Sequence, residues 1–368
     1  MTEDRRDSRR QELKETPITA WNRAAGAKMA DFAGWAMPIE YPAGTISEHR
    51  AVRSGCGLFD VSHMGTVRIS GGPAVARLNE TLTNDLAVLD DGQVQYTLLC
   101  DENGGVVDDM LATRMRADEV LLVPNASNTA AVLAVLREAL GDEAVVDEGD
   151  VAAILAVQGP ASPGVLESLG LPSRHRYLTV ETAKFEGVPV IVSRTGYTGE
   201  VGFEIFVPVA AAARLWESLI QVPAVTPAGL GARDTLRTEM GYPLHGHELS
   251  ASIGPVEAGL AWAVAWDKPH FIGDAELRRQ RAEGPKRRLR GVRVTGRGVP
   301  RPGMVVREGG RDIGLLTSGT FSPTLGTGIG LALVEPDVPL DSEVDVDIRG
   351  KSVAGLLVRP PFVDSSPK

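Results

Sequence analysis

The sequence predicts an α+β protein of two or three domains that ends in a small all-β unit. Its 368 residues exceed one ordinary hydrophobic core, and 43% of them are hydrophobic, which is enough to fill several cores. Hairpin patterns alternate with patterned helices before about residue 285. Short strands separated by glycine turns follow, which is typical of a small barrel or sandwich.

Composition limits the partners of this protein. Its formal net charge is −10, whereas a protein that binds phosphate backbones needs a basic surface, so nucleic acid is not expected as a partner. No apolar run approaches a membrane span, and the N-terminus lacks the apolar core of a signal peptide. Cys56 and Cys100 form no CxxC pair, which indicates reduced thiols and no cysteine zinc site. We therefore expect a cytoplasmic protein that is not bound to a membrane.

The chain begins with a polar segment and then becomes rich in aromatic residues. Residues 1–15 carry too little apolar surface to fold, so we expect a loose tail. Residues 31–41 form a dense aromatic patch, and a short helix over 47–53 ends at Gly55. Residues 58–65 have the composition of a strand.

Two side chains of this predicted strand, His63 and Met64, are candidates for a ligand site. Adjacent strand residues face opposite ways, so only one of them can face a given pocket. A lone histidine of this kind is more often a hydrogen-bonded structural residue than a ligand. Met64 is ordinary core filling, although its flexible thioether also suits the wall of a pocket for a flat ligand.

A predicted hairpin carries the most informative pair of residues, Asp108 and Asp109. Residues 96–100 and 106–115 are rich in β-branched and apolar residues, and Asn103-Gly104-Gly105 between them is typical of a turn. Neighbouring strand residues point to opposite faces, so one acid must face a buried surface. A buried carboxylate needs a partner or a chemical role. The pair either guards a sheet edge with charge or supplies a catalytic or ligand-orienting acid.

Further helices and strands keep the α+β order. Ser127 is predicted to cap a helix over residues 130–140, and a second unit begins near Val151 with a strand over 154–157. Other predicted helices cover residues 73–82 and the region around 214–220.

The block over residues 193–207 combines glycines, an aromatic ring and an acid. Three glycines spaced by three make a tight loop where the backbone can approach a ligand, although the dinucleotide pattern GxGxxG is absent. Tyr197 supplies a flat face with a hydroxyl. Glu204 lies in an apolar strand. It either accepts paired donors from a heterocycle that presents an amino group beside a ring N–H, or it pairs with a nearby arginine.

A short helix between Gly231 and Gly241 carries Arg233 near its start. A cation gains nothing from the helix dipole there. Arg233 is therefore expected to pair with an acid, either Glu204 or a ligand carboxylate. The run His245-Gly246-His247-Glu248 lacks the HExxH pattern, so a metal site is not favoured.

Residues 276–301 form a conspicuous basic segment in an acidic protein. The segment is either a solvated helix end with an interdomain linker, or a docking patch for an acidic partner or a polyanionic cofactor tail. Beyond its start, strands are predicted over residues 289–294, 304–307, 313–318, 329–334, 344–348 and 354–358.

Several motifs occur together and in order along the chain. They are Phe32-Ala33-Gly34-Trp35, the run 59–65 (Phe-Asp-Val-Ser-His-Met-Gly), 104–109, 193–204, 229–234, 257–262 and 317–326. As a set they closely resemble the aminomethyltransferase, or T-protein, family of the glycine cleavage system. The resemblance runs from about residue 16 to Phe362 without large insertions.

The resemblance implies three domains arranged like a cloverleaf around a central folate cavity. Two are mixed α+β domains, and the third is a C-terminal β-barrel or jelly-roll-like domain. The implied first domain is discontinuous, with residues 16–62 and 150–250. The second comprises residues 63–149 and 251–284, and the barrel domain comprises residues 285–364.

The resemblance also implies a tetrahydrofolate enzyme that needs no metal. The family moves the methylene of an aminomethyl group from the lipoyl arm of H-protein to tetrahydrofolate, and it releases ammonia. Carried over position by position, the critical acid is Asp109, the pterin-reading carboxylate is Glu204 and the binding arginine is Arg233. The other positions expected to line the cavity are Met64, Tyr96, Asn125, Tyr197 and Trp262.

Physical chemistry gives Asp109 a role in such a reaction. Cleavage of the carbon–nitrogen bond creates an iminium-like cation, which a fixed carboxylate stabilises. Whether Asp109 also removes a proton is open, because a carboxylate with a pKa of about 3.9 is a poor base for an amine. The basic segment further predicts that Arg287 and Arg288 dock the carrier. No residue after Phe362 is assigned to folate, and the role of His245, where many relatives have tyrosine, is open.

Two other functions compete with this interpretation. A related folate enzyme demethylates a small methylated amine or sulfonium compound, and such relatives are often fused to an oxidase domain, for which this chain has no flavin-binding segment. A folate-binding assembly factor for iron–sulfur enzymes resembles the same chamber but bears a Lys-Gly-Cys-Tyr-type motif, which this sequence lacks.

Overall fold

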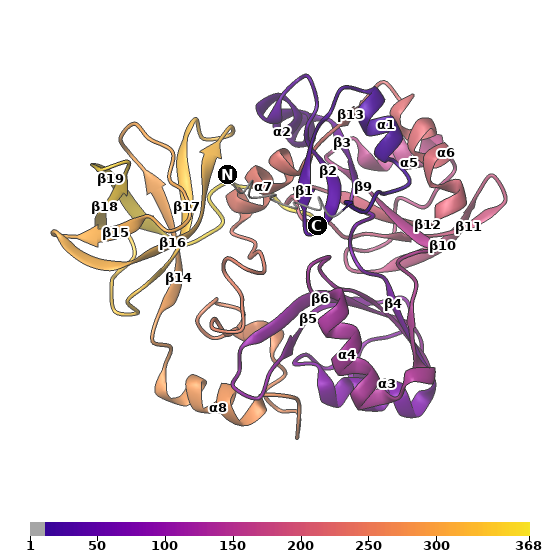
Figure 1. Cartoon of the computed structure of the whole chain (residues 1–368), viewed down its shortest axis with the longest axis horizontal. Helices are drawn as coiled ribbons and strands as arrows, with labels where there is room; N and C mark the ends of the chain where they lie inside the picture. The colour runs from indigo at the N-terminus through magenta and orange to yellow at the C-terminus, as the bar shows by residue number, and fades with distance from the viewer. Residues whose placement is uncertain (1–11) are drawn as a thin grey trace, which may run out of the picture.

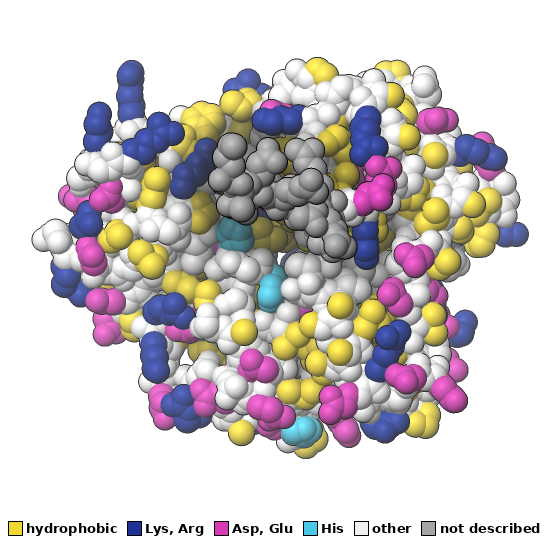
Figure 2. All heavy atoms as spheres, in the orientation of Figure 1, with side chains coloured by type: hydrophobic (Ala, Val, Ile, Leu, Met, Phe, Trp, Pro, Cys, Tyr) yellow, Lys and Arg dark blue, Asp and Glu magenta, His cyan; other side chains and the backbone are white. Residues whose placement is uncertain are grey.

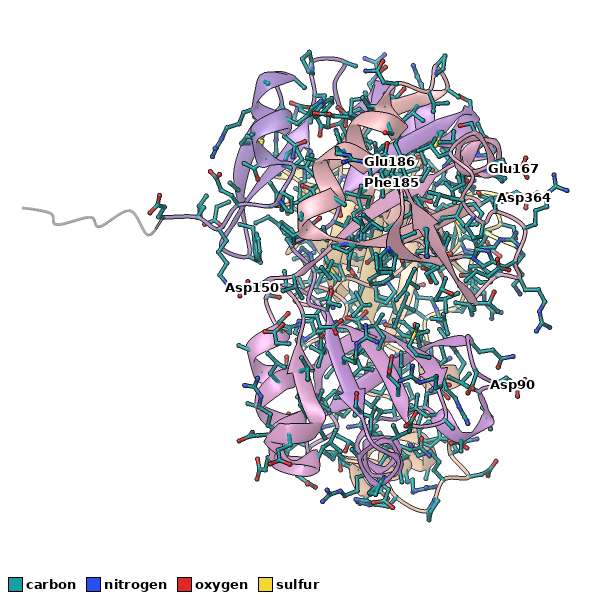
Figure 3. All side chains as sticks on the ribbon, turned by 90° about the vertical axis from the view of Figure 1, so that its right-hand side faces the viewer. Asp90, Asp150, Glu167, Phe185, Glu186 and Asp364 are labelled. Atoms are coloured by element: carbon teal, nitrogen blue, oxygen red, sulfur yellow. The ribbon has the colours of Figure 1, made fainter. Side chains whose placement is uncertain are left out.

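Three units surround the centre of the molecule in the computed structural model, which describes residues 12–368 (Figure 1). Two of them are mixed α+β units, and the third is a closed β-barrel. Seen from the side, the two α+β units lie one above the other, with Glu186 on the upper unit, Asp90 on the lower unit and Asp150 between them (Figure 3). The predicted α+β class and the final barrel are confirmed.

The first unit is built on a six-stranded sheet with helices on both faces. Its elements are α1 (Thr19–Ala24), β1 (Lys28–Phe32), β2 (Trp35–Glu40), α2 (Thr45–Ser54), β3 (Cys56–Asp60), β9 (Ala152–Gln158), α5 (Ser162–Ser168), β10 (Val180–Phe185), β11 (Val188–Ser193), β12 (Gly202–Pro208), α6 (Val209–Ile220), β13 (Val225–Pro227) and α7 (Leu230–Met240). The strand order is β10-β11-β12-β9-β3-β13, antiparallel except that β13 runs parallel to β3. One face packs against α5 and α6 around Trp216, and the other packs against α2 and α7 around Phe59. β1 and β2 form a separate hairpin.

The second unit contains the predicted hairpin as β5 and β6. Its elements are β4 (Val67–Ser70), α3 (Gly72–Thr81), η1 (Leu86–Val88), β5 (Val94–Cys100), β6 (Val106–Arg116), β7 (Glu119–Val123), α4 (Thr129–Leu140), η2 (Asp142–Ala144) and β8 (Val145–Asp147). The antiparallel order is β5-β6-β7-β4-β8, so β6 is an inner strand. α3 and α4 cover one face around Leu78 and Leu136. The other face, which includes Leu98, packs against a later segment with η3 (Ala261–Ala263) and α8 (Asp274–Glu283).

The third unit is a six-stranded barrel, and it contains every strand that the sequence predicts after residue 288. Its strands are β14 (Arg288–Val294), β15 (Val305–Glu308), β16 (Arg311–Ser322), β17 (Thr327–Val334), β18 (Glu343–Ile348) and β19 (Lys351–Val358). They close in the order β14-β17-β16-β15-β18-β19. Alternate residues of β18 are buried, as expected when one face of a strand fills a barrel core.

Two buried charged residues of α7 hold the barrel against the first unit. The carboxylate of Glu239 accepts Nη2 of Arg53 at 2.8 Å and the hydroxyl of Ser322 on β16. The guanidinium of Arg237 donates to the hydroxyl of Ser318 at 2.7 Å. Because both side chains are almost fully buried, α7 is fixed between the sheet and the barrel.

The predicted strand over residues 58–65 ends early. β3 stops at Asp60, whose Oδ1 accepts the backbone N–H of Ser62 at 3.0 Å. Such a local bond competes with the strand ladder for the backbone, so the chain turns. His63 and Met64 therefore lie in a turn and not in a strand.

Three expectations about the ends and the organisation of the chain have different outcomes. Residues 1–11 of the predicted tail lie outside the described residues, whereas the backbone of Lys14 bonds to Gly34 and Ala36 and so is part of the fold. None of the helices within residues 12–368 has the length and apolarity needed to cross a bilayer. The residues at which one domain gives way to the next stay a prediction.

Candidate active site

Asp109 lies on the face of β6 that is turned away from α3 and α4. It is opposite Leu98 of β5, and its Oδ2 accepts the hydroxyl of Tyr96 at 2.8 Å. Its Oδ1 lies 3.1 Å from the amide nitrogen of Asn125. Burial raises the pKa of Asp109, while the bond from Tyr96 and the charge of His245 oppose that rise. The result is an acid held by two donors and more basic than a free carboxylate.

Asp108 faces the other way, toward the start of α4, so the predicted opposition of the two acids is confirmed. Its carboxylate is fully buried and accepts the backbone N–H of Asn125 at 2.9 Å and the side-chain amide of Asn128 at 2.7 Å. Burial, and then the charge of Asp109, raise the pKa of Asp108 to about 7. The sheet-edge interpretation is wrong, because β6 is an inner strand.

The predicted cap of α4 by Ser127 is wrong. Asn128, and not Ser127, occupies the cap position before Thr129, and its side chain makes no bond to the helix. The amide of Asn128 is directed to Asp108 instead. Ser127 donates its hydroxyl to the side-chain oxygen of Asn128 at 3.1 Å.

A flat aromatic surface lies beside Asp109. The rings of Tyr96 and Trp262 are stacked, with centroids 5.5 Å apart and an interplanar angle of 29°. Trp262 is 66% exposed, which is unusual for so large an apolar side chain. An exposed indole stacked on a held phenol is suited to contact with another flat ring.

The loop between β11 and β12 presents Tyr197 to two neighbours. The guanidinium carbon of Arg233 lies 4.8 Å from the centroid of the Tyr197 ring, and the ring of Tyr242 is stacked at 5.7 Å. The hydroxyl of Tyr197 donates to the backbone oxygen of Pro243. Burial lowers the pKa of Arg233, and the negative charge of Glu204 opposes this. Nη1 of Arg233 is buried without a hydrogen-bond partner within residues 12–368.

Glu204 has one polar partner in the described part of the chain. Its Oε2 accepts the hydroxyl of Thr195 at 2.5 Å. No arginine nitrogen comes within ion-pair distance of Glu204 among residues 12–368, so the alternative of an arginine pair is not observed. Arg233 is near enough for its charge to interact with that of Glu204, but the two do not form a direct bond. Both groups therefore keep hydrogen-bonding capacity.

The residues on the hairpin face and those on the Tyr197 loop influence one another electrostatically. Burial raises the pKa of Tyr197. The positive charge of Arg237 opposes this rise, and the negative charge of Asp109 adds to it. Burial also raises the pKa of Tyr96, and Asp109 and Tyr197 add to that rise. Charges interact in this way only over short distances, so the hairpin face and the Tyr197 loop lie close together. Met64 is partly buried and packs against the cluster around Phe59.

Sequence reasoning missed several contacts of these residues. Thr195 bonds to Glu204, Tyr242 stacks on Tyr197, and Asn128 bonds to Asp108, the neighbour of Asp109 in β6, but their types are common in loops and carry no separate signal. His63, expected to be hydrogen-bonded, has an Nδ1 that is buried without a partner in the described chain. Burial, and then the charge of Arg233, lower the pKa of His63 to about 3, so the ring is neutral.

The histidines near residue 245 are engaged with backbone. Nε2 of His245 lies 3.0 Å from the oxygen of Val106, and Nδ1 of His247 lies 2.8 Å from the oxygen of Thr317. Within residues 12–368 no group of three or more His, Cys, Asp or Glu side chains is arranged to hold a metal.

Within residues 12–368, two members of the basic segment, Arg279 and Arg287, form ion pairs. Arg279 bonds to Glu276 and Glu283 on α8, and Arg287 pairs with Glu257 at 3.0 Å. Figure 2 shows Lys and Arg side chains intermixed with Asp and Glu over this side of the molecule. Arg288 is exposed at the start of β14. Arg287 is therefore less available to a partner than the sequence predicts.

Comparisons with known proteins cover almost the whole chain. The family described as GCVT N-terminal domain matches residues 18–268, and the glycine cleavage T-protein C-terminal barrel domain matches residues 287–364. An aminomethyltransferase of Parafrankia sp. is 52% identical, with 97% of this chain and 100% of the relative covered. An aminomethyltransferase of Mycobacterium tuberculosis is 50% identical, with 96% of this chain and 97% of the relative covered. The crystal structure of glycine cleavage system aminomethyltransferase T from Bartonella henselae superposes with a TM-score of 0.91 at 35% identity, over 96% of this chain and 99% of that chain.

Proposed function

The chain belongs to the glycine cleavage T-protein family of aminomethyltransferases, and from that premise we propose the reaction and the residues that carry it out. The one-carbon unit is the methylene of an aminomethyl group on the lipoyl arm of H-protein. It passes to tetrahydrofolate, and the products are ammonia, 5,10-methylenetetrahydrofolate and dihydrolipoyl H-protein. The observation that carries the proposal is Asp109, a carboxylate held by Tyr96 and Asn125 close to Tyr197.

The chemistry of the surrounding residues fits a reduced pterin. Such a ring is flat and offers an amino group and ring N–H donors. Glu204 has a second carboxylate oxygen to receive such donors, and Nη1 of Arg233 lacks an acceptor within the described chain. The stacked pair of Tyr96 and Trp262 offers a flat wall. We therefore propose Met64, Tyr96, Asn125, Tyr197, Glu204, Arg233 and Trp262 as folate-binding residues.

Tetrahydrofolate, when bound, supplies the nucleophilic nitrogen that accepts the one-carbon unit. The role of the protein is to stabilise charge and to hold groups in place. Asp109 keeps an anionic oxygen on the face of β6 where positive charge develops as ammonia leaves. Its raised pKa also makes it a better proton acceptor than a free carboxylate. Tyr96 and Asn125 prevent the carboxylate from rotating away.

We propose lipoylated H-protein as the macromolecular partner, with Arg288 and not Arg287 as the contributor from the basic segment. Arg287 forms an ion pair with Glu257, which neutralises its charge. Arg288 is exposed, and its charge adds to burial in lowering the pKa of the neighbouring Arg290. Neither Arg288 nor Arg290 makes an ion pair within residues 12–368, and two such cations on one strand favour an acidic partner surface.

We also propose a cytoplasmic location. It is supported by Cys56 and Cys100, which are both buried free thiols. Thiols of this kind are usual in a reducing compartment.

A product assay tests the proposed function directly. The protein is incubated with tetrahydrofolate and an aminomethylated lipoyl carrier, and methylenetetrahydrofolate and ammonia are measured together. Equal amounts of both products are expected. A parallel series with small methylated amines and sulfonium compounds should give no methylenetetrahydrofolate. Transfer from those compounds, with none from the carrier, would contradict the proposal.

A further inference from the structure

The side-chain amide of Asn125 lies between two carboxylates on opposite faces of β6. Its Nδ2 is 2.8 Å from Oδ1 of Asp108, 2.9 Å from the backbone oxygen of Asp109 and 3.1 Å from Oδ1 of Asp109. An amide nitrogen carries only two N–H groups. Three oxygens therefore compete for two N–H groups. How well Asn125 bonds to the carboxylate of Asp109 depends on its bond to Asp108.

Asp108 is a buried acid that the reaction itself does not use. It is 0% exposed and is directed toward the loop before α4, so it cannot touch a substrate on the Asp109 face. Its neighbours in that loop, Asn125 and Asn128, are neutral. The titratable groups around it are Asp109, next in the strand, and Tyr96 on β5, whose pKa burial and nearby charges including Asp108 raise. No cation pairs with Asp108 within residues 12–368.

We propose that Asp108 is a positioning residue for methylene transfer: when ionised, it holds Asn125, and Asn125 fixes the carboxylate of Asp109. Asp108 grips Asn125 twice, through the backbone N–H at 2.9 Å and through the side-chain amide at 2.8 Å. This inference rests on the proposed role of Asp109. It adds that Asp108, on the opposite face of β6, orients the carboxylate of Asp109 toward the substrate.

Protonation of Asp108 should loosen this arrangement. An ionised carboxylate accepts all three bonds that Asn125 and Asn128 donate, whereas a protonated one turns one oxygen into a donor. The neutral carboxyl is also a weaker acceptor, so its hold on the two asparagines weakens. Burial, and next the charge of Asp109, raise the pKa of Asp108 to about 7, so the change falls near neutral pH. Because the protonated form is the loosened one, transfer should be full above about pH 7 and should fall below it.

Asn128→Ala is the decisive variant, because Asn128 contacts Asp108 and does not contact Asp109. Loss of one donor to the ionised form raises the pKa of Asp108 further. In single-turnover transfer with saturating folate, the acidic limb of the rate profile should move up by about 0.5–1 pH unit. The plateau at high pH should change less than about twofold, because Asp109 keeps its own donors.

The matched control is Ser127→Ala in the same loop. Ser127 is exposed and bonds only to the side chain of Asn128 among the described residues. Its removal should leave the acidic limb where it is in the unmodified protein. An equal shift in both variants, or no shift in Asn128→Ala, would overturn the inference.

Asp108→Asn gives a second readout if the variant folds. The acidic limb that Asp108 causes should disappear, and the plateau rate should fall about 10- to 100-fold because Asp109 is no longer aimed. Folate affinity should change by less than about threefold, which distinguishes a positioning role from a binding role. A plateau within twofold of the unmodified protein would contradict the inference. Failure of the unmodified protein to form methylenetetrahydrofolate would instead contradict the proposed function.

Discussion

The junction between α7 and the barrel should depend on the charge of Glu239. This carboxylate is fully buried and bonds to Arg53 on α2 and to Ser322 and Thr324 on the barrel, while Nε2 of His49 lies at 3.3 Å. Glu239→Gln keeps the shape of the side chain and removes the charge. Arg53 then loses a buried anionic partner, which is a costly loss in a low-dielectric interior.

The pKa of Glu239 sets the size of the effect. Burial alone would raise it, but the bond and charge of His49, followed by Ser322 and Arg53, hold the pKa of Glu239 at about 2, against 4.5 for a free glutamate. A difference of this size corresponds to about 3 kcal/mol of folding free energy. Because the pKa is lowered by folding, this stabilisation is complete above about pH 4.5 and is lost as the pH falls toward 2. The difference in free energy of unfolding between the unmodified protein and Glu239→Gln should be about 1 kcal/mol smaller at pH 4 than at pH 7.

Urea unfolding at pH 7 and at pH 4 measures both quantities, and the fluorescence of buried Trp216 reports on the first unit. Glu167→Gln is the control, because Glu167 pairs with Arg174 at an exposed site, where ion pairs contribute little. The control should unfold at nearly the same urea concentration as the unmodified protein. A loss below about 1 kcal/mol in Glu239→Gln at pH 7, or a loss that does not shrink at pH 4, would refute the reasoning.

Three further substitutions test the surroundings of the site. Trp262→Ala removes the exposed half of the stack on Tyr96 and should raise the KM for folate about 10-fold with little change in Tm; an unchanged KM would remove Trp262 from the folate site. Arg233→Gln should weaken folate binding about 10- to 100-fold in a calorimetric titration, because a charged donor is lost, and unaltered affinity would contradict its assignment. Arg288→Glu should raise the KM for the carrier and reduce its salt dependence, whereas Lys184→Glu, on β10, should do neither. Equal effects of the two reversals would mean that net charge alone matters.

Local pattern was sufficient to predict the hairpin and the short strands of the last unit, although it left open whether those strands form a barrel or a sandwich. Alternation of apolar residues and the Asn103-Gly104-Gly105 turn define β5 and β6, because both signals act between neighbours in sequence. The opposite directions of Asp108 and Asp109 follow from the same period of two. The strands, the turn and the directions of the two acids therefore depend on nearby residues and not on distant contacts.

Distant contacts decided the elements that the sequence did not predict. Asn128 occupies the cap position of α4 and makes no side-chain cap bond, and its amide donates to Asp108, 20 residues earlier. Arg233 of α7 stacks on Tyr197 in the loop between β11 and β12, and it does not pair directly with Glu204. Each outcome depends on which side chains the fold brings together, and no local rule supplies that information.

The site assignments came from the resemblance, and residue chemistry alone left them open. Glu204 by itself suited either a heterocycle or an arginine, and the structure removes the second alternative within residues 12–368. Tyr96 gave no local signal of its bond to Asp109, 13 residues along the chain, although the two strands of a hairpin make such a contact natural.

The most direct test of the central claim is the transfer rate of Asp109→Asn in a single turnover with aminomethylated carrier and saturating tetrahydrofolate. Loss of a unit charge about 4 Å from a developing cation corresponds to about 4 kcal/mol near a protein surface, or roughly a 1,000-fold slower rate. The variant should bind folate with nearly unchanged affinity and unfold at a similar temperature. A rate within about threefold of the unmodified protein would contradict the account.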